Sequence, residues 1–104
     1  MLQSQARPLN RLEWYPLTRD YVARVPTAGG VYWLGAGGEV IYIGMSHNLR
    51  QRLPSHLATA DPCIRLATVF AFDMDPNPEA REEAALRDYL RRYRRLPRCN
   101  DRRR

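Results

Sequence analysis

The stretch that decides the fold is GGVYWLGAGGEVIYIG, residues 29–44. It contains two runs rich in β-branched and aromatic residues, VYWL at 31–34 and VIYIG at 40–44, separated by glycines. Two such runs on either side of a glycine-rich turn predict a β-hairpin. Each run carries one tyrosine, Tyr32 in the first and Tyr42 in the second. The question is whether this pair serves core packing or chemistry.

The length of the hairpin turn decides whether the two tyrosines meet, because side chains alternate between the faces of a strand. A two-residue turn at 37–38 places Tyr32 and Tyr42 on opposite faces of the sheet. A three-residue loop at 36–38 places them directly opposite each other on one face, and a glycine at its end suits the left-handed conformation that such loops need. The residues alone allow both arrangements, and cross-strand aromatic pairs are also common core packing.

Further elements are indicated on both sides of the hairpin by the spacing of apolar residues. We expect helices in residues 17–25, 46–60 and 79–96 and a third strand in residues 63–75. The second helix begins at Ser46 or Asn48, and Pro54 should bend it. This order predicts a small α/β (α+β) domain built on a three-stranded antiparallel sheet flanked by helices.

The chain of 104 residues is long enough for one domain with a modest core. We divide it into a poorly ordered N-terminal arm (1–16), a globular domain (17–100) and a basic C-terminal tail (101–104). Neither a signal peptide nor a membrane span is indicated. Cys63 and Cys99 suggest neither a metal spacing nor a disulfide framework. We therefore expect a soluble protein of the reducing cytoplasm with no membrane contact.

Positive charge is concentrated at the C-terminal end. All 17 basic residues are arginine, and the net charge is +6. Residues 87–104 hold nine arginines and two aspartates, whereas residues 1–86 hold eight arginines and nine acidic residues. Clustered arginine is typical of phosphate binding, because the forked guanidinium meets phosphate oxygens in a bidentate manner. The pattern favours a polyanionic partner.

Polar residues continue the pattern after the hairpin: Arg50, Arg52, His56, Glu79, Glu82, Glu83 and Asn100. With these residues in this order, the sequence resembles the GIY-YIG nuclease superfamily, which includes excision-repair and homing endonucleases. Gly30-Val31-Tyr32 stands as the first signature element and Tyr42-Ile43-Gly44 as the second. The resemblance covers roughly residues 26–100.

The resemblance implies roles for five residues of this chain. Tyr32 and Tyr42 would lie side by side, which requires a hairpin loop with an odd number of residues. Tyr42 would be the general base and Tyr32 its partner in orienting a water. Arg52 matches the family arginine, and His56 matches a histidine that other members replace by tyrosine. Asn100 matches the asparagine that closes the family's core.

The resemblance also implies one glutamate near the start of the last helix as the sole protein ligand of a divalent metal ion. We take Glu83 as this catalytic metal ligand, because it precedes Ala-Ala-Leu and would share a helix face with the apolar residues Leu86, Leu90 and Tyr93. Glu82 is the second choice. The usual family spacing from Asn100 falls nearer Asp88, which should face solvent. The lysine that often follows the second signature is absent, and Ser46 and His47 stand there instead.

These residue types agree with phosphodiester hydrolysis. A cation held by a carboxylate, Mg²⁺ or Mn²⁺, neutralises charge on the phosphate, and an arginine stabilises the charge that develops. A tyrosine, with an unperturbed pKa of about 10, needs nearby positive charge to act as a base. We therefore expect an endonuclease that nicks DNA with low sequence specificity; branched or damaged DNA and RNA stay open as substrates.

Two alternatives from other classes stay open. One is a nucleic-acid-binding module that keeps the fold with weak or no catalysis, in line with the displaced acid and the missing lysine. The other is a protein-interaction domain that uses the arginine-rich helix against an acidic partner. The oligomeric state is not indicated by the sequence.

Overall fold

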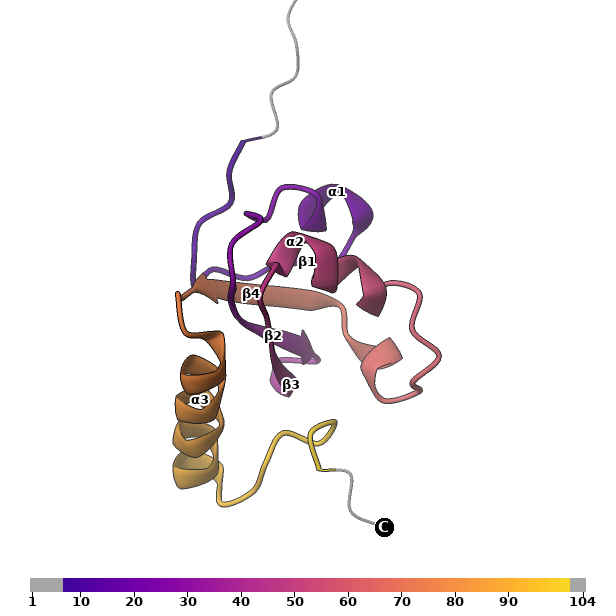
Figure 1. Cartoon of the computed structure of the whole chain (residues 1–104). Helices are drawn as coiled ribbons and strands as arrows, with labels where there is room; N and C mark the ends of the chain where they lie inside the picture. The colour runs from indigo at the N-terminus through magenta and orange to yellow at the C-terminus, as the bar shows by residue number, and fades with distance from the viewer. Residues whose placement is uncertain (1–6, 102–104) are drawn as a thin grey trace, which may run out of the picture.

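The structure, a computed structural model, describes residues 7–101 and contains a four-stranded antiparallel sheet in the order β1-β4-β2-β3 (Figure 1). Its strands are β1 (Tyr15–Pro16), β2 (Gly30–Ala36), β3 (Glu39–Ser46) and β4 (Val69–Met74). The predicted α+β class with an antiparallel sheet is confirmed. The predicted number of three strands is wrong by one, because β1 adds a short strand next to β4.

The additional strand comes from the segment that we expected to be a poorly ordered arm. Tyr15 pairs with Phe70 of β4, and its ring lies 6.0 Å from the Phe70 ring and 5.6 Å from the Tyr21 ring. The Leu12 N–H donates to the Phe72 carbonyl at 2.7 Å. Part of the predicted arm is therefore fixed along β4, and residues 1–6 lie outside the described residues.

Helices form in the three predicted regions, although all three are shorter than predicted, the last only slightly. They are α1 (Arg19–Val22), α2 (Leu49–Arg52), α3 (Pro78–Tyr93) and the 3-10 helices η1 (Leu53–His56) and η2 (Ile64–Leu66). Asn48 is the N-cap of α2, where its side chain accepts from the Gln51 N–H. Pro54 lies where α2 changes into η1, in line with the hydrogen bond that proline cannot make. Between residues 7 and 101, no helix has the length and apolar character needed to span a bilayer.

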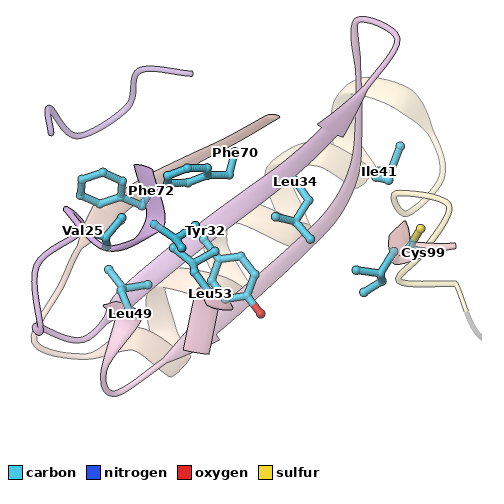
Figure 2. Close-up of a cluster of buried hydrophobic side chains, with 11 residues drawn as sticks. Val25, Tyr32, Leu34, Ile41, Leu49, Leu53, Phe70, Phe72 and Cys99 are labelled. Atoms are coloured by element: carbon cyan, nitrogen blue, oxygen red, sulfur yellow. The ribbon is translucent and has the colours of Figure 1, made fainter. Parts of the chain in front are cut away.

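Two hydrophobic clusters cover the two faces of the sheet, with α1 and α2 on one face and α3 on the other (Figure 1). Figure 2 shows the larger cluster, which combines strand residues with residues of the short helices: Val22, Val25, Tyr32, Leu34, Ile41, Leu49, Leu53, Ile64, Phe70, Phe72 and Cys99. The smaller cluster contains Val31, Ile43, Ala85 and Tyr89. Tyr32 is thus part of the larger core.

Helix α3 packs on the sheet through a different face from the one we predicted. The buried residues of this helix are Pro78, Ala85 and Tyr89, whereas Leu90 and Tyr93 are 46% and 52% exposed. The small Ala85 side chain lets the helix approach β2 and β3, and the Tyr89 hydroxyl donates to the Val40 carbonyl at 3.4 Å. Of the predicted stripe, Leu86 packs against the smaller cluster, whereas Leu90 and Tyr93 do not, so the helix face that meets the sheet is rotated by about one residue from the predicted one.

Candidate active site

The hairpin turn has two residues, so the prediction of an odd-numbered loop is wrong. Ala36 pairs with Glu39, which leaves Gly37 and Gly38 as the turn. Their φ angles are 60° and 79°, in the left-handed region that two-residue hairpin turns with the twist of the strands require.

A bulge in β3 brings the tyrosines to the same face in spite of this turn. The register shifts so that Leu34 faces Tyr42 while the next residue, Gly35, faces Val40. Ile41 is therefore an additional residue on β3, and such a bulge interrupts the alternation of side chains. Ile41 and Tyr42 consequently both contact the cluster that contains Tyr32. The predicted proximity of Tyr32 and Tyr42 is present, with ring centroids 6.1 Å apart.

Gly44 makes room for this arrangement, because it lies directly opposite Tyr32 on β3. A Cβ atom at Gly44 would lie 2.5 Å from the Tyr32 hydroxyl oxygen and 2.8 Å from Cε2 of Tyr42. Real Cβ atoms do not approach other atoms this closely. The glycine of the second signature element therefore allows the Tyr32 side chain to lean across the edge strand.

His56, at the end of η1, closes the cluster from the other side. Its Nε2 lies 2.7 Å from the Tyr32 hydroxyl, and its ring centroid lies 5.3 Å from that of Tyr32 and 5.9 Å from that of Tyr42. Burial, followed by the positive charge of Arg52, lowers the pKa of His56 to about 4. His56 is therefore neutral at neutral pH, and Nε2 can accept the Tyr32 proton.

Arg52, the last residue of α2, adds a positive charge beside both tyrosines. The pKa of Arg52 is raised most by its hydrogen bond and electrostatic interaction with Tyr32. Its interactions with Tyr42 raise this pKa further. Arg50 is directed elsewhere, since its Nε donates to the Val25 carbonyl at 2.6 Å. The structure thus brings Arg52 to the predicted site and leaves Arg50 outside it.

The two tyrosines differ in their surroundings. Tyr32 is 1% exposed. Burial, then the neighbouring Tyr42, raises the pKa of Tyr32 to about 12, against the opposing influence of Arg52. The Tyr32 hydroxyl is consequently protonated at neutral pH. Tyr42, on the edge strand, is only half-buried.

Of the three acids that we considered as metal ligands on α3, only Glu82 shows an interaction with this cluster. Glu83 is 74% exposed at its side chain and lies 3.8 Å from Arg87, and Asp88 lies 3.9 Å from Arg91. Burial, followed by the charge of Glu79, raises the pKa of Glu82. The charge of Glu82 also raises the pKa of Tyr32, although its effect is smaller than those of burial, Tyr42 and Arg52. The choice of Glu83 relied on a helix face that is not the buried one.

One carboxylate is a sufficient protein contribution for Mg²⁺, which keeps several waters and is often bound through one or two carboxylates plus phosphate oxygens. Glu82 supplies a carboxylate whose charge acts on Tyr32 of this cluster. No group of three or more His, Cys, Asp or Glu side chains suited to a metal occurs in the part of the chain that the structure describes. The donor set therefore fits a water-rich hard cation and not an all-protein cage.

His47 and Glu79 form a second pair near the start of α3. His47 Nε2 lies 2.7 Å from Glu79 Oε2, and both side chains are exposed. The backbone hydrogen bond at the helix start, then His47, lowers the pKa of Glu79. His47 thus occupies the position where the family lysine is missing.

Asn100 lies on the outer edge of β3, where its carboxamide makes two hydrogen bonds to one residue. The Ile43 N–H donates to Oδ1 at 2.8 Å, and Nδ2 donates to the Ile43 carbonyl at 2.9 Å. Ile43 directly follows Tyr42. The tie between the C-terminal segment and the strand is therefore present, and Asn100 acts on the backbone beside the site.

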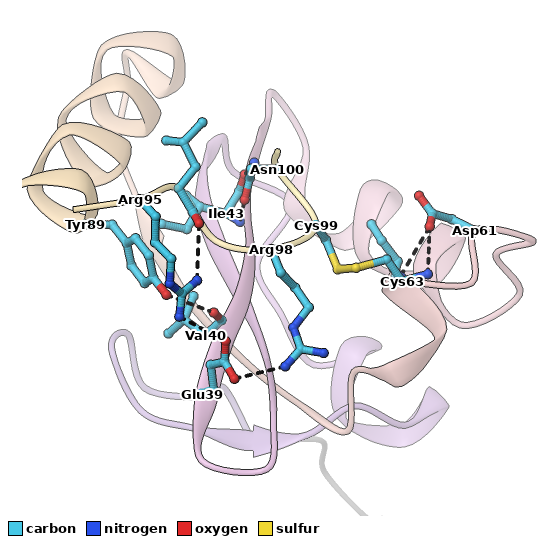
Figure 3. Close-up of a disulfide and its surroundings, with 12 residues drawn as sticks. Glu39, Val40, Ile43, Asp61, Cys63, Tyr89, Arg95, Arg98, Cys99 and Asn100 are labelled. Carbon is cyan, nitrogen blue, oxygen red and sulfur yellow. Dashed lines mark hydrogen bonds and ion pairs between the residues drawn. A yellow bond between two sulfur atoms is a disulfide. The ribbon is translucent and has the colours of Figure 1, made fainter. Parts of the chain in front are cut away.

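Cys63 and Cys99 form a disulfide, so our interpretation of the two cysteines is wrong (Figure 3). Their Cα atoms are 5.7 Å apart, although 36 residues separate them in the sequence. The fold brings together two segments whose proximity no local spacing indicates. A disulfide of this kind typically stabilises a domain by about 2–4 kcal/mol.

Comparison with known families adds to this geometry. Residues 8–89 match the family described as "Domain of unknown function (DUF7508)". The chain belongs to this DUF7508 family. Comparison with curated proteins gives no match.

The DUF7508 chain is similar in structure to the GIY-YIG N-terminal endonuclease domain of UvrC from Thermotoga maritima. The magnesium-bound domain is 24% identical, with a TM-score of 0.59 over 77% of this chain and 91% of that chain. A point mutant of the same domain with its catalytic divalent cation is 23% identical over the same shares, also at 0.59. An asparagine-to-alanine mutant is 25% identical over 77% and 90%, again at 0.59. The predicted GIY-YIG fold is confirmed.

Proposed function

We propose that this protein is a divalent-cation-dependent endonuclease that hydrolyses phosphodiester bonds of DNA. The observation that carries the proposal is the cluster of Tyr32, Tyr42, Arg52 and His56, which draws on both hairpin strands and on α2–η1. A domain that only binds nucleic acid has no need for a buried tyrosine–histidine hydrogen bond beside an arginine. The GIY-YIG fold of the chain supports the same class of activity.

The proposed role of Tyr32 is to orient and not to exchange protons. Its hydroxyl keeps its proton at neutral pH and donates it to Nε2 of neutral His56. The Tyr32 oxygen is then free to accept, from Arg52 or from the attacking water. His56 is a positioning residue in this scheme, because a histidine with a pKa of about 4 is not an imidazolium at neutral pH and so cannot serve as a general acid.

Tyr42 is the group that we assign as general base. It is the less buried tyrosine and lies beside the Arg52 guanidinium. In this scheme the Tyr42 oxygen, with its own proton released to solvent, takes a proton from the water that attacks phosphorus, and the bond from phosphorus to the leaving oxygen breaks. Arg52 stabilises the negative charge that develops on the phosphate oxygens, an effect that oriented donors supply in many enzymes.

We move the proposed metal ligand from Glu83 to Glu82, because Glu82 is the acid on the side of the tyrosines. A cation such as Mg²⁺ or Mn²⁺, when bound there, supplies neutralisation of the phosphate and of the leaving oxygen. The exposed arginines of α3 and the C-terminal segment support DNA as the partner, since they provide charge for phosphate contacts. One site cuts one strand, so we expect nicks.

The test is incubation of the protein with supercoiled plasmid in Mg²⁺, in Mn²⁺ and in EDTA. We expect relaxed circles with either cation and none with EDTA. The Arg52→Ala variant serves as the matched control for a contaminating nuclease, and we expect it to lower the rate about 10²- to 10³-fold. Salt-sensitive DNA binding without cleavage under any cation would favour the binding-module alternative.

A further inference from the structure

The disulfide joins the two segments that build the site from opposite directions. Cys63 lies in the segment that continues from α2–η1, which carries Arg52 and His56. Cys99 precedes Asn100, whose carboxamide holds Ile43 (Figure 3). The covalent bond therefore connects the helical side of the site with the strand side.

The position of Tyr42 depends on the C-terminal segment. The Cys99 N–H donates to the Ile41 carbonyl at 2.8 Å, and Asn100 makes its two bonds to Ile43. Cys99 and Asn100 thus hold the backbone on both sides of Tyr42. Because β3 is the last strand of the sheet, these contacts take the place of a neighbouring strand.

The disulfide is the covalent anchor of this segment. Arg95 and Arg98 add ion pairs, with guanidinium nitrogens 3.4 Å and 3.0 Å from the Glu39 carboxylate. Both arginine side chains are about half exposed, and exposed ion pairs contribute little to stability. Cys99 is 1% exposed, whereas Cys63 is half-buried, so Cys63 is the more accessible of the two to an attacking thiol.

We propose that the Cys63–Cys99 disulfide is a redox-sensitive positioning element that holds Asn100 on β3 and thereby Tyr42 in its place. A dithiol reduces it in two steps. One thiolate attacks the Cys63 sulfur, the S–S bond breaks, and Cys99 leaves as a thiolate that takes up a proton. The second thiol of the reductant then displaces Cys63 and becomes part of a cyclic disulfide. Two electrons and two protons pass from the dithiol to the two cysteines.

This inference rests on the proposed function only for its activity readout. The rate of thiol–disulfide exchange depends on access to the attacked sulfur, and Cys63 is the less buried of the two cysteines. The oxidised chain is the form with an ordered site. Reduction releases Asn100 without removing any side chain that faces the phosphate.

The activity test compares the whole chain in oxidised form and after reduction with dithiothreitol, with the thiol state checked by alkylation and mass measurement. We expect reduction to lower the kcat of plasmid nicking about 10- to 100-fold, as for a small displacement of a catalytic group, with KM nearly unchanged. The double variant Cys63→Ser, Cys99→Ser should behave as the reduced chain and ignore dithiothreitol. Equal kcat in both states would overturn the proposal.

The second readout needs no nuclease activity. The Ile43 amide is protected by Asn100, so its hydrogen exchange should become faster on reduction, while the Trp33 amide on the central strand β2 serves as the control for global unfolding. Asn100→Ala should give fast Ile43 exchange in both redox states. Arg98→Gln, which removes only the ion pair with Glu39, should leave Ile43 protected while the disulfide is intact.

The two readouts separate this inference from the proposed function. If Ile43 stays protected after complete reduction, the disulfide does not position Asn100 and the inference is wrong. If Ile43 exchange responds to reduction but no cation supports cleavage, the inference about positioning holds and the proposed nuclease function fails.

Discussion

Strands β2 and β3 carry nearly mirror-image tripeptides, Gly30-Val31-Tyr32 and Tyr42-Ile43-Gly44, yet their tyrosines lie in different surroundings. β2 lies between β4 and β3, whereas β3 has a strand on one side only. Tyr32 is fully buried and bonded to His56. Tyr42 is half-buried on a strand that Cys99 and Asn100 hold in place.

This difference teaches that the same side chain is buried by its neighbours in the inner strand and left partly accessible in the edge strand. A hydroxyl in the core, hydrogen-bonded to a neutral histidine, is suited to orientation. A hydroxyl at the edge, beside a guanidinium, is suited to proton transfer. Substitutions on each strand and around it can test this division of roles.

The largest effect should come from Glu82, the proposed metal ligand whose charge acts on Tyr32. Glu82→Gln keeps the shape of the side chain and removes the charge that a hard cation requires, so divalent-ion-dependent cleavage should be abolished with DNA binding retained. Glu83→Gln, one residue away, is the matched control and should cleave like wild type in the same plasmid assay. Loss of cleavage in the Glu83 variant alone would restore our first choice of ligand.

Removing the hydroxyl of Tyr42 should mainly lower the rate of cleavage, whereas removing the hydroxyl of Tyr32 should mainly lower stability. Tyr42→Phe should lower kcat about 10²- to 10⁴-fold, the usual contribution of a general base, with the free energy of unfolding nearly unchanged. Tyr32→Phe leaves the buried His56 Nε2 without its partner and should cost about 1–3 kcal/mol of stability, with a smaller loss of rate. Denaturant titration and single-turnover nicking measure both quantities; identical profiles for the two variants would contradict the division of roles.

Gly44, which lies opposite Tyr32, is the position where a side chain on β3 would disturb the tyrosines of both strands. Gly44→Ala forces the two tyrosine rings apart, because the new methyl group meets both of them. Overpacking of this kind costs about 1–3 kcal/mol, which thermal unfolding would detect. Ala substitution of Gly37, where a Cβ meets no atom within 4 Å but φ is positive, separates steric crowding from backbone strain.

Lowering the pH should destabilise the protein through His56, which is hydrogen-bonded to Tyr32 on β2. The folded pKa of His56 is about 4, below its ordinary value of 6.5. Between these values the unfolded chain binds a proton that the folded chain does not, so stability falls as pH drops from 6.5 towards 4 and is unaffected by this group above 6.5. His56→Gln should flatten this part of the stability–pH curve. An unchanged curve would show that His56 is not held neutral.

The smallest effect on chemistry should come from charges outside both strands. Neutralising Arg91, Arg92, Arg94 and Arg95 together should flatten the dependence of log K for DNA on log salt, by up to about 0.9 for each phosphate that is no longer neutralised. Fluorescence anisotropy at several salt concentrations measures the slope. We expect kcat at saturating DNA to stay close to that of wild type, and an unchanged slope would mean that these arginines do not contact phosphate.

The amino-acid sequence indicated which residues come together better than how the fold brings them together. The proximity of Tyr32 and Tyr42 was predicted, but through a three-residue loop. The two-glycine turn is a local signal, whereas the bulge at Ile41 depends on the pairing of β3 with β2 and has no local signature.

The remaining errors have a similar cause. On α3 the larger side chains Leu90 and Tyr93 suggested the buried face, while close packing on the sheet selected the small Ala85. The disulfide depends on proximity across 36 residues of sequence. Strand β1, with two residues, is too short to show periodicity.

The carboxamide of Asn100 has a consequence for self-association. It presents one N–H donor and one C=O acceptor to Ile43, as a peptide group of an adjoining strand would. Open sheet edges invite strands of other molecules and lead to aggregation. Here the middle of the outer strand is already occupied by a side chain from its own chain, so a second molecule cannot extend the sheet at that position without first displacing Asn100.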